Sequence, residues 1–358
     1  MNLKVLSAIA CFCSAVLSPI NIENRQEDCR AGFPAFRRDQ PNERGRMGYI
    51  DSTGNLLIDY KFYYVGNFQE GLAPVQLEQE GKFGYINASG DLVIEPSFDV
   101  AFPFFESRAQ VRIKGMWGYV NRTGELVIQP QFELGDNFHE GLAAIRVRGK
   151  WGYIDLNGET VIAPKFEQAN RFSEGLACVR ESGKLGYIDK AGNYVSHKRF
   201  EAMSSPTTAL FAPNYSEGLA VFTQGGKYGY IDRAGNIVIQ PHFKSADRFS
   251  DGLAPVTIGG KSGFIGTGGA WSIAPRFDAA RGFSDGLAAI MIGRKWGFID
   301  RTGRVIIREQ FENVGNFVCG LSRVSFGLDW GYIGKNGNLI WKSSAMRPSS
   351  PMRRARIS

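Results

Sequence analysis

The sequence predicts an all-β protein that is built as a tandem array of about nine three-stranded antiparallel units. The first observation is a glycine followed by Tyr or Phe, which recurs at Gly48, Gly84, Gly118, Gly152, Gly186, Gly229, Gly263, Gly297 and Gly331. Six of the eight intervals between these glycines are 34 residues long, and such a fixed period is typical of repeat architectures. The second observation is that aromatic and β-branched residues flank each glycine, which favours strands. The third is an abundance of turn residues, with 44 Gly among 358 residues.

The clearest copy of the unit, residues 150–183, shows where its first two strands lie. Trp151–Asp155 and Thr160–Ala163 are rich in aromatic and β-branched side chains. Between them, the segment Asp155–Gly158 has an acceptor side chain at its first position and glycine at its last, which predicts a tight turn. We expect Pro164 to end the second strand, because proline cannot donate a hydrogen bond to a ladder.

The third strand is Leu176–Arg180, which follows the turn Ser173–Gly175 and leads through Glu181–Gly183 into the next Trp-Gly strand, so residues 164–172 connect one three-stranded meander to the next. Alternation along a strand sends Trp151 and Tyr153 to one face, and Gly152 with its neighbour Ile154 to the other. Both faces carry apolar groups, so we expect adjacent units to cover both. The glycine allows close approach of the backbone or leaves room for a ring from the next unit.

A degenerate copy of the third strand already begins at Gly32, before the first Trp-Gly strand. Each of nine units between Gly32 and Lys342 therefore has all three of its own strands. Closed propellers often borrow a strand across their ends, and they usually have four to eight blades. Self-contained units therefore favour an open, superhelical β-array, and closure into a β-propeller is the alternative.

The two ends of the chain differ in composition from the array. An apolar run from Val5 to Leu17 predicts a signal peptide at residues 1–20, followed by a linker at 21–31 and the array at 32–342. Residues 343–358 form a basic tail that we expect to be disordered. The protein is then exported to the periplasm, the cell surface or the medium, with no transmembrane span in the mature chain. If the apolar run instead packs on the array, the protein is cytoplasmic.

The net charge of +7 is concentrated outside the units, since the last sixteen residues contribute +4. This distribution does not describe a nucleic-acid-binding face, so we expect no nucleic acid partner.

The five cysteines do not predict a disulfide framework. Cys11 and Cys13 would leave with the signal peptide, and Cys29 lies outside the units. Cys178 and Cys319 belong to units four apart, and distant units of a stacked array cannot approach each other. We therefore expect Cys178 and Cys319 to be free thiols.

Two further patterns recur once per unit. A carboxylate precedes the third strand at Glu70, Glu106, Glu140, Glu174, Glu217, Asp251 and Asp285. We interpret these carboxylates as acceptors for backbone amides of turns, or as partners of the hairpin lysines Lys82, Lys150, Lys184, Lys227, Lys261 and Lys295. A cation site or a general acid is the alternative. The aromatic ladder at the Trp positions is interpreted as core, with a sugar-binding platform as its alternative.

No pattern predicts a catalytic, cofactor or metal site. His139, His197 and His242 occupy three different positions of the repeat, so they do not recur at metal-ligand spacing. The fifth unit carries an insertion at residues 204–213, where Leu210 and Phe211 are candidate contacts for a partner if the loop projects from the array. A drifted linker without function is the other interpretation.

The units resemble the WG, or KWG, repeat family. The resemblance depends on Lys150–Asp155 (KWGYID), on Lys295–Asp300 (KWGFID), and on the recurring Glu-Gly-Leu-Ala and Pro-x-Phe. It implies a bacterial, often exported protein that mediates interactions, and it supplies no catalytic residues. We therefore expect a non-enzymatic scaffold that binds a protein or a cell-envelope polysaccharide. The alternatives are a carbohydrate-binding surface protein and an enzyme with its site at the 204–213 loop.

Overall fold

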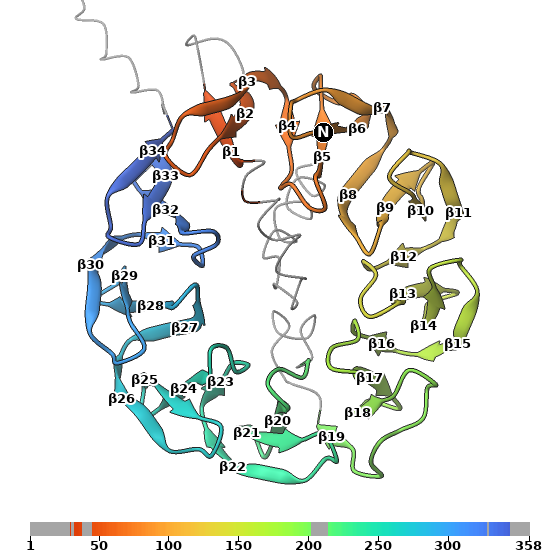
Figure 1. The fold of residues 1–358 in the computed structure, drawn as a ribbon. Coiled ribbons are helices and arrows are strands. Elements are labelled where there is room, and N and C mark those ends of the chain that lie inside the picture. The colour runs from red at the N-terminus through yellow and green to blue at the C-terminus, as the bar shows by residue number, and fades with distance from the viewer. Residues whose placement is uncertain (1–28, 30–31, 38–44, 202–213, 328, 344–358) are drawn as a thin grey trace, which may run out of the picture.

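The computed structural model describes residues 29, 32–37, 45–201, 214–327 and 329–343. These residues form nine small antiparallel sheets that are arranged as blades around a central axis (Figure 1). The predicted signal peptide, the 204–213 insertion with Leu210 and Phe211, the linker apart from Cys29, and the tail beyond Ser343 lie outside the described residues.

The fourth blade shows the architecture. It contains β12 (Leu134–Gly135), β13 (Leu142–Val147), β14 (Lys150–Asp155) and β15 (Thr160–Phe166), each paired antiparallel with the next. The short strand β12 lies at the inner edge of the ring and β15 at its circumference (Figure 1). The three predicted strands are confirmed, but the link between units also contributes a short inner strand that the sequence interpretation did not include.

The remaining blades repeat this order. The first three contain β1 (Phe33–Arg37), β2 (Arg46–Ile50) and β3 (Leu56–Phe62); β4 (Tyr64–Val65), β5 (Leu72–Gln76), β6 (Phe83–Asn87) and β7 (Leu92–Phe98); and β8 (Val100–Phe105), β9 (Arg108–Ile113), β10 (Met116–Val120) and β11 (Leu126–Phe132). The fifth and sixth contain β16 (Gln168–Ala169), β17 (Ala177–Glu181), β18 (Lys184–Ile188) and β19 (Phe200–Glu201); and β20 (Leu219–Gln224), β21 (Lys227–Asp232) and β22 (Ile237–Phe243). The last three contain β23 (Ser245–Ala246), β24 (Leu253–Ile258), β25 (Lys261–Gly266) and β26 (Trp271–Phe277); β27 (Ala279–Ser284), β28 (Leu287–Ile292), β29 (Lys295–Ile299) and β30 (Val305–Phe311); and β31 (Asn313–Val314), β32 (Leu321–Phe326), β33 (Asp329–Gly334) and β34 (Leu339–Lys342).

The turn between β14 and β15 has the predicted chemistry. The Gly158 N–H donates to the carbonyl of Asp155 at 3.0 Å, and Gly158 has a φ of +87°, which favours glycine. The Asp155 carboxylate accepts hydrogen bonds from the backbone N–H groups of Asn157 and Glu159, both at 2.9 Å. The turn therefore satisfies its own backbone and fixes the hairpin.

The glycine after Trp151 is required by a bulge in the neighbouring strand. Trp151 pairs with Phe166 and Tyr153 with Ile162, so three residues of β15 lie opposite Gly152 alone. A Cβ on this glycine would lie 2.4 Å from the Ile162 carbonyl oxygen. The expectation that Pro164 ends the strand is wrong, because this proline lies in the bulge of an outer strand, where no ladder donor is needed.

Both faces of each blade are covered by its neighbours, as predicted. Tyr153 packs in one cluster with Val179 and Ile188 of the fifth blade, whereas Ile154 packs in another with Tyr119 of the third. The Tyr153 hydroxyl also donates to the carbonyl of Asn170, in the next blade, at 2.6 Å. The same bond recurs from Tyr49 to Gly66, from Tyr85 to Phe102, from Tyr119 to Asp136 and from Tyr230 to Asp247.

The array closes into a ring, so the expected open superhelix is wrong and the propeller alternative is correct. The rings of Phe33 in the first blade and Tyr332 in the last lie 5.6 Å apart, and the Tyr332 hydroxyl donates to the Pro34 carbonyl at 3.1 Å. The Trp341 Nε1–H donates to the Tyr60 hydroxyl at 3.3 Å. Each blade is rotated by a small angle relative to the one before, and over nine blades these rotations return the chain to its start.

Closure also corrects the cysteine interpretation. Cys319 is not free, because it forms a disulfide with Cys29 across 290 residues of sequence, with their Cα atoms 5.7 Å apart. In an open array these residues would lie at opposite ends. Cys178 is a free, buried cysteine, as predicted.

Candidate interaction surface

The two ends of the ring are built from different turns. Successive strands of an antiparallel blade run in opposite directions, so its turns alternate between the ends. In the fourth blade, the turns at Glu140 and at Asp155–Gly158 lie at one end, which we call the acidic face. The turn at Arg148 and the link from β15 to β16 lie at the other end, which we call the basic face.

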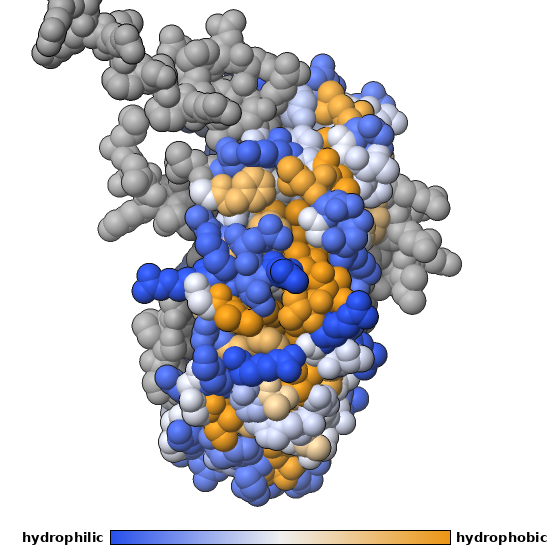
Figure 2. Space-filling model, turned by 90° about the vertical axis from the view of Figure 1, so that its left-hand side faces the viewer, coloured by the Kyte–Doolittle hydropathy of each residue, from blue (hydrophilic) through white to orange (hydrophobic). Residues whose placement is uncertain are grey.

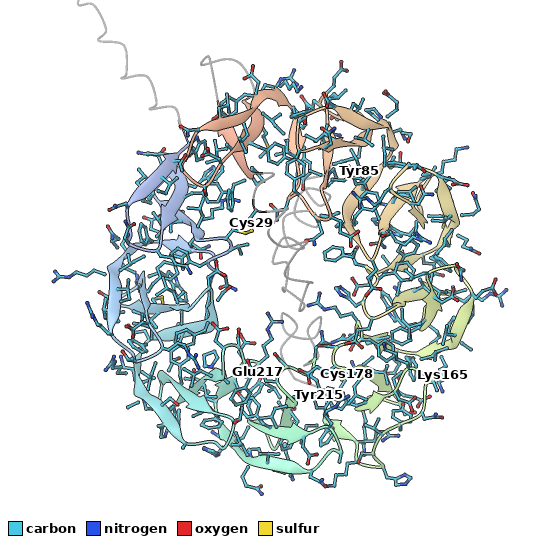
Figure 3. The ribbon with its side chains drawn as sticks, viewed as in Figure 1. Cys29, Tyr85, Lys165, Cys178, Tyr215 and Glu217 are labelled. Carbon is cyan, nitrogen blue, oxygen red and sulfur yellow. A yellow bond between two sulfur atoms is a disulfide. The ribbon has the colours of Figure 1, made fainter. Side chains whose placement is uncertain are left out.

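A ladder of carboxylates runs along the inner edge of the acidic face. Glu140 has a φ of +55°, and its carboxylate accepts a hydrogen bond from the Gly175 N–H of the next blade at 2.8 Å. The same bond joins Glu70 to Ser107, Glu106 to Gly141, Glu174 to Gly218, Glu217 to Gly252 and Asp285 to Gly320. Figure 3 places Glu217 toward the inner edge of the ring. The prediction of turn acceptors is confirmed, with the difference that each accepted amide belongs to the following blade.

A second ladder uses the residue before this carboxylate. The Ser173 hydroxyl donates to the carbonyl of Tyr215 in the next blade at 2.8 Å. The bond recurs from Ser216 to Phe249, from Ser250 to Phe283 and from Ser284 to Phe317. These two ladders hold adjacent blades together where their inner edges are closest.

The other interpretation of the ladder carboxylates, as partners of the hairpin lysines, is wrong. Lys261 pairs with Asp278 at 2.6 Å and Lys295 with Glu312 at 3.6 Å, and all four residues lie on the basic face. Further ion pairs on this face join Lys82 to Asp99, Arg146 to Glu133 and Arg180 to Glu167. The carboxylates of the basic face are thus largely neutralised, whereas Lys114, Arg148, Lys150, Lys184, Lys227 and Arg294 project from its turns.

The acidic face has the opposite balance. Its turns in the described residues carry fifteen carboxylates: Asp51, Glu70, Asp91, Glu106, Glu125, Glu140, Asp155, Glu159, Glu174, Asp189, Glu217, Asp232, Asp251, Asp285 and Asp300. They carry seven bases: Arg108, Arg122, Lys190, Arg233, Arg301, Arg304 and Lys335. Within this described set one ion pair forms, between Lys190 and Glu140 at 3.4 Å. Hydrogen bonds from Thr53 and Thr302 hold the pKa values of Asp51 and Asp300 below their usual range, so both are ionised at neutral pH.

One part of the inner acidic face is buried. His139 lies under Phe105, with ring centroids 5.4 Å apart, and its Nε2 accepts a hydrogen bond from Arg171 at 3.3 Å. Burial, with a smaller contribution from the Arg171 charge, lowers the His139 pKa to about 3. Burial raises the pKa of the neighbouring Asp136, and Arg171 opposes that effect. His139 is therefore neutral at physiological pH and acts as an acceptor.

The three histidines lie in three separate blades. His242 is exposed, with its Nδ1 2.7 Å from the Gln240 carbonyl oxygen, and His197 is also exposed. Among the residues that the structure describes, no group of three His, Cys, Asp or Glu side chains is placed to hold a metal ion.

The described tryptophans of the Trp-Gly steps have contacts on their rings. The Arg323 guanidinium lies 4.0 Å from the centroid of Trp330 and the Arg281 guanidinium 4.5 Å from that of Trp296. Trp151 packs against the core of its blade. The tryptophans of the Trp-Gly steps are thus partly buried at the edge of the core, and these contacts give no support to a sugar-binding platform.

A third surface, the outer belt, follows the circumference. In eight outer strands, one or both of the first two residues are apolar and 36% to 51% exposed: Leu56, Leu57, Leu92, Val93, Val127, Val161, Ile237, Val238, Trp271, Val305, Ile306 and Leu339. Figure 2 shows hydrophobic residues along this edge of the molecule, flanked by hydrophilic ones. The prolines of five outer strands, Pro96, Pro130, Pro164, Pro241 and Pro275, limit pairing with another strand.

Nine antiparallel blades around one axis define the chain as a β-propeller. The model of the "WG containing repeat" family matches residues 47–82, 83–117, 117–151, 151–184, 228–261, 263–296 and 296–327, so the chain belongs to this repeat family. A search of curated proteins finds no match.

Solved structures with a similar fold are distant in sequence. A crystal structure of the eukaryotic initiation factor is 12% identical and has a TM-score of 0.59, over 86% of this chain and 95% of the other. BamB from Moraxella catarrhalis is 14% identical with a TM-score of 0.39, over 86% and 92% of the two chains. At 12% identity the likeness to the initiation factor shows the fold alone. No helix in the described part of the chain is long and apolar enough to cross a membrane.

Proposed function

We propose that this propeller is a non-enzymatic scaffold that binds a positively charged protein partner through its acidic face. The observation that carries the proposal is the separation of charge between the two ends of the ring. Fifteen described carboxylates lie on one face with a single ion pair among them, whereas six ion pairs neutralise carboxylates of the other face. A face of one sign attracts and orients a partner of the opposite sign.

The proposal includes export, and the Cys29–Cys319 disulfide supports it. Disulfides persist in oxidising compartments and are rare where thiols are kept reduced. The charge of the acidic face also favours a basic protein over an anionic polysaccharide, because like charges repel.

Binding of a fluorescent deca-lysine peptide tests the proposal by fluorescence anisotropy. We expect saturable binding that weakens about tenfold between low and physiological salt, because the salt screens exposed charges. Reversal of three exposed turn residues, Asp91→Lys, Glu125→Lys and Glu159→Lys together, should abolish the binding.

The matched control reverses three exposed bases on the other face, Lys114→Glu, Lys150→Glu and Lys184→Glu. It should leave binding of deca-lysine unchanged or slightly stronger. If the two triple variants behave alike, or if heparin binds and deca-lysine does not, the acidic face is not the binding surface.

A further inference from the structure

One junction of the ring carries a disulfide at its inner edge. At six of the nine junctions, the described residues show a carboxylate of one blade that accepts a backbone N–H of the next. In the last blade the equivalent residue is Cys319, which is followed by Gly320 as Glu140 is by Gly141. The φ of Cys319 is +54° and that of Glu140 +55°, so the backbone is the same and only the side chain differs.

Cys319 makes a covalent bond where the other blades make a hydrogen bond. Its disulfide to Cys29 reaches the segment just before Gly32, and Gly32 occupies the position of Gly141 and Gly175 in the repeat. Figure 3 shows Cys29 beside the last blade, at the inner edge of the ring. The disulfide therefore joins the first and last blades at the level of the carboxylate ladder.

This junction, which we call the seam, is packed mainly by aromatic side chains. Among the described residues its cluster contains four buried members, Ala35, Ile50, Leu321 and Tyr332, with Phe33, Tyr60, Trp330, Ile340 and Trp341 packed against them and partly buried. In the described residues the first blade has three strands and β1 is its innermost. The seam thus has a covalent link where six other junctions have a carboxylate–amide hydrogen bond.

We propose that the Cys29–Cys319 disulfide is a redox-controlled clasp of the ring. When it is oxidised, the first and last blades are held together. When a dithiol reduces it, two electrons and two protons pass to the sulfur atoms, the S–S bond breaks into two thiols, and the dithiol becomes a disulfide. The seam then keeps its aromatic packing and hydrogen bonds such as that from Tyr332 to Pro34, but it has neither a covalent link nor the carboxylate–amide bond of six other junctions, so it opens before them.

Hydrogen exchange measured by mass spectrometry on the full chain tests the clasp, with Cys11 and Cys13 changed to Ser to prevent disulfide exchange. Dithiothreitol should increase the exchange rate about tenfold or more in β1, β2, β33 and β34, and leave blades three to seven unchanged. The double variant Cys29→Ser, Cys319→Ser should show the same fast exchange without reductant.

Cys178→Ala is the matched control, because this cysteine is buried and free. It should keep the response of the seam to dithiothreitol. Equal exchange at the seam in the oxidised and reduced protein would overturn the proposal, and so would an increase spread evenly over all nine blades. These results do not depend on the acidic-face proposal, which is tested by the binding of deca-lysine.

Discussion

At the residue scale, the repeated glycine after the Trp position is defined by backbone geometry. In seven blades, a Cβ added at this glycine would lie 2.3 to 2.5 Å from the backbone carbonyl oxygen of an isoleucine in the outer strand of the same blade. This isoleucine occupies the same repeat position each time: Ile58, Ile94, Ile128, Ile162, Ile239, Ile273 and Ile307. Real side chains do not approach so closely. The glycine therefore permits the bulge that lets the outer strand curve around its blade.

Gly152→Ala should destabilise the protein by about 3 kcal/mol, because the added methyl group forces the bulge apart. Urea unfolding followed by circular dichroism measures the change. Gly268→Ala is the control, because a Cβ added there would meet no atom within 4 Å and its φ is not in the left-handed region. Similar losses in both variants would show that close approach is not the cause.

The buried His139 makes stability depend on pH. Its folded pKa of about 3 lies below the usual 6.5, so the unfolded chain binds a proton that the folded chain does not as pH falls below 6.5. Stability from this group is present above pH 6.5 and is lost progressively toward pH 3. We expect a loss of about 2 kcal/mol at pH 5.

His139→Ser, which introduces the residue found at Ser173 in the next blade, should remove this loss. Thermal unfolding of both proteins at pH 7 and pH 5 measures the difference. If the variant and the wild type lose stability equally between the two pH values, His139 does not titrate as proposed.

At the element scale, the ladder carboxylates act between blades. Each carboxylate residue has a left-handed backbone conformation in its turn and accepts a hydrogen bond from an N–H in the corresponding turn of the next blade. The same residue therefore forms a turn in its own blade and fixes the spacing between the two blades. The sequence predicted the acceptor role of these carboxylates. It could not show that the donor lies one blade further on, because that depends on the angle between blades.

Glu140→Ala should destabilise the protein by about 1 to 2 kcal/mol, because the Gly175 N–H loses its partner at a partly buried junction. The ion pair with Lys190 adds little, since it is exposed. Chemical denaturation measures the loss. Glu159→Ala removes an exposed carboxylate from the same face and should be neutral within about 0.5 kcal/mol. Equal effects would mean that the amide bond contributes nothing.

At the scale of the whole molecule, the ring is closed by aromatic packing and a disulfide, without a strand shared between the first and last blades in the described residues. We expected an open array because each unit has its own three strands, so the first and last units do not need to share a strand. Closure by side chains alone shows that self-contained units do not require open ends.

A carboxylate should be able to replace the disulfide at the seam. The variant Cys29→Ser, Cys319→Glu restores the residue type of the other junctions and offers an acceptor to the Gly32 N–H. Its melting temperature should be the same with and without dithiothreitol and higher than that of Cys29→Ser, Cys319→Ser. Equal melting of the two double variants would contradict the equivalence of the two kinds of link.

The sequence by itself determined the features that repeat within one unit or between neighbours. These are the strands, the turn at Asp155–Gly158, the glycine at Gly152, the packing of both blade faces, and the acceptor role of residues such as Glu140. Each depends on interactions over some tens of residues, which leave a local pattern of residue types. The fourth, inner strand was missed because in most blades it has only two residues, as β12 does, which is too little pattern to detect; β8 and β27, with six residues each, are the exceptions.

Only the tertiary structure decided that the array closes, that Cys29 meets Cys319, and that acidic and basic residues separate onto two faces. Closure depends on the sum of nine small rotations, and no single unit encodes that sum. The disulfide follows from closure, because it joins residues 290 positions apart. The separation of charge follows from which turns share an end of the ring, so the same residues would define no face in an extended chain.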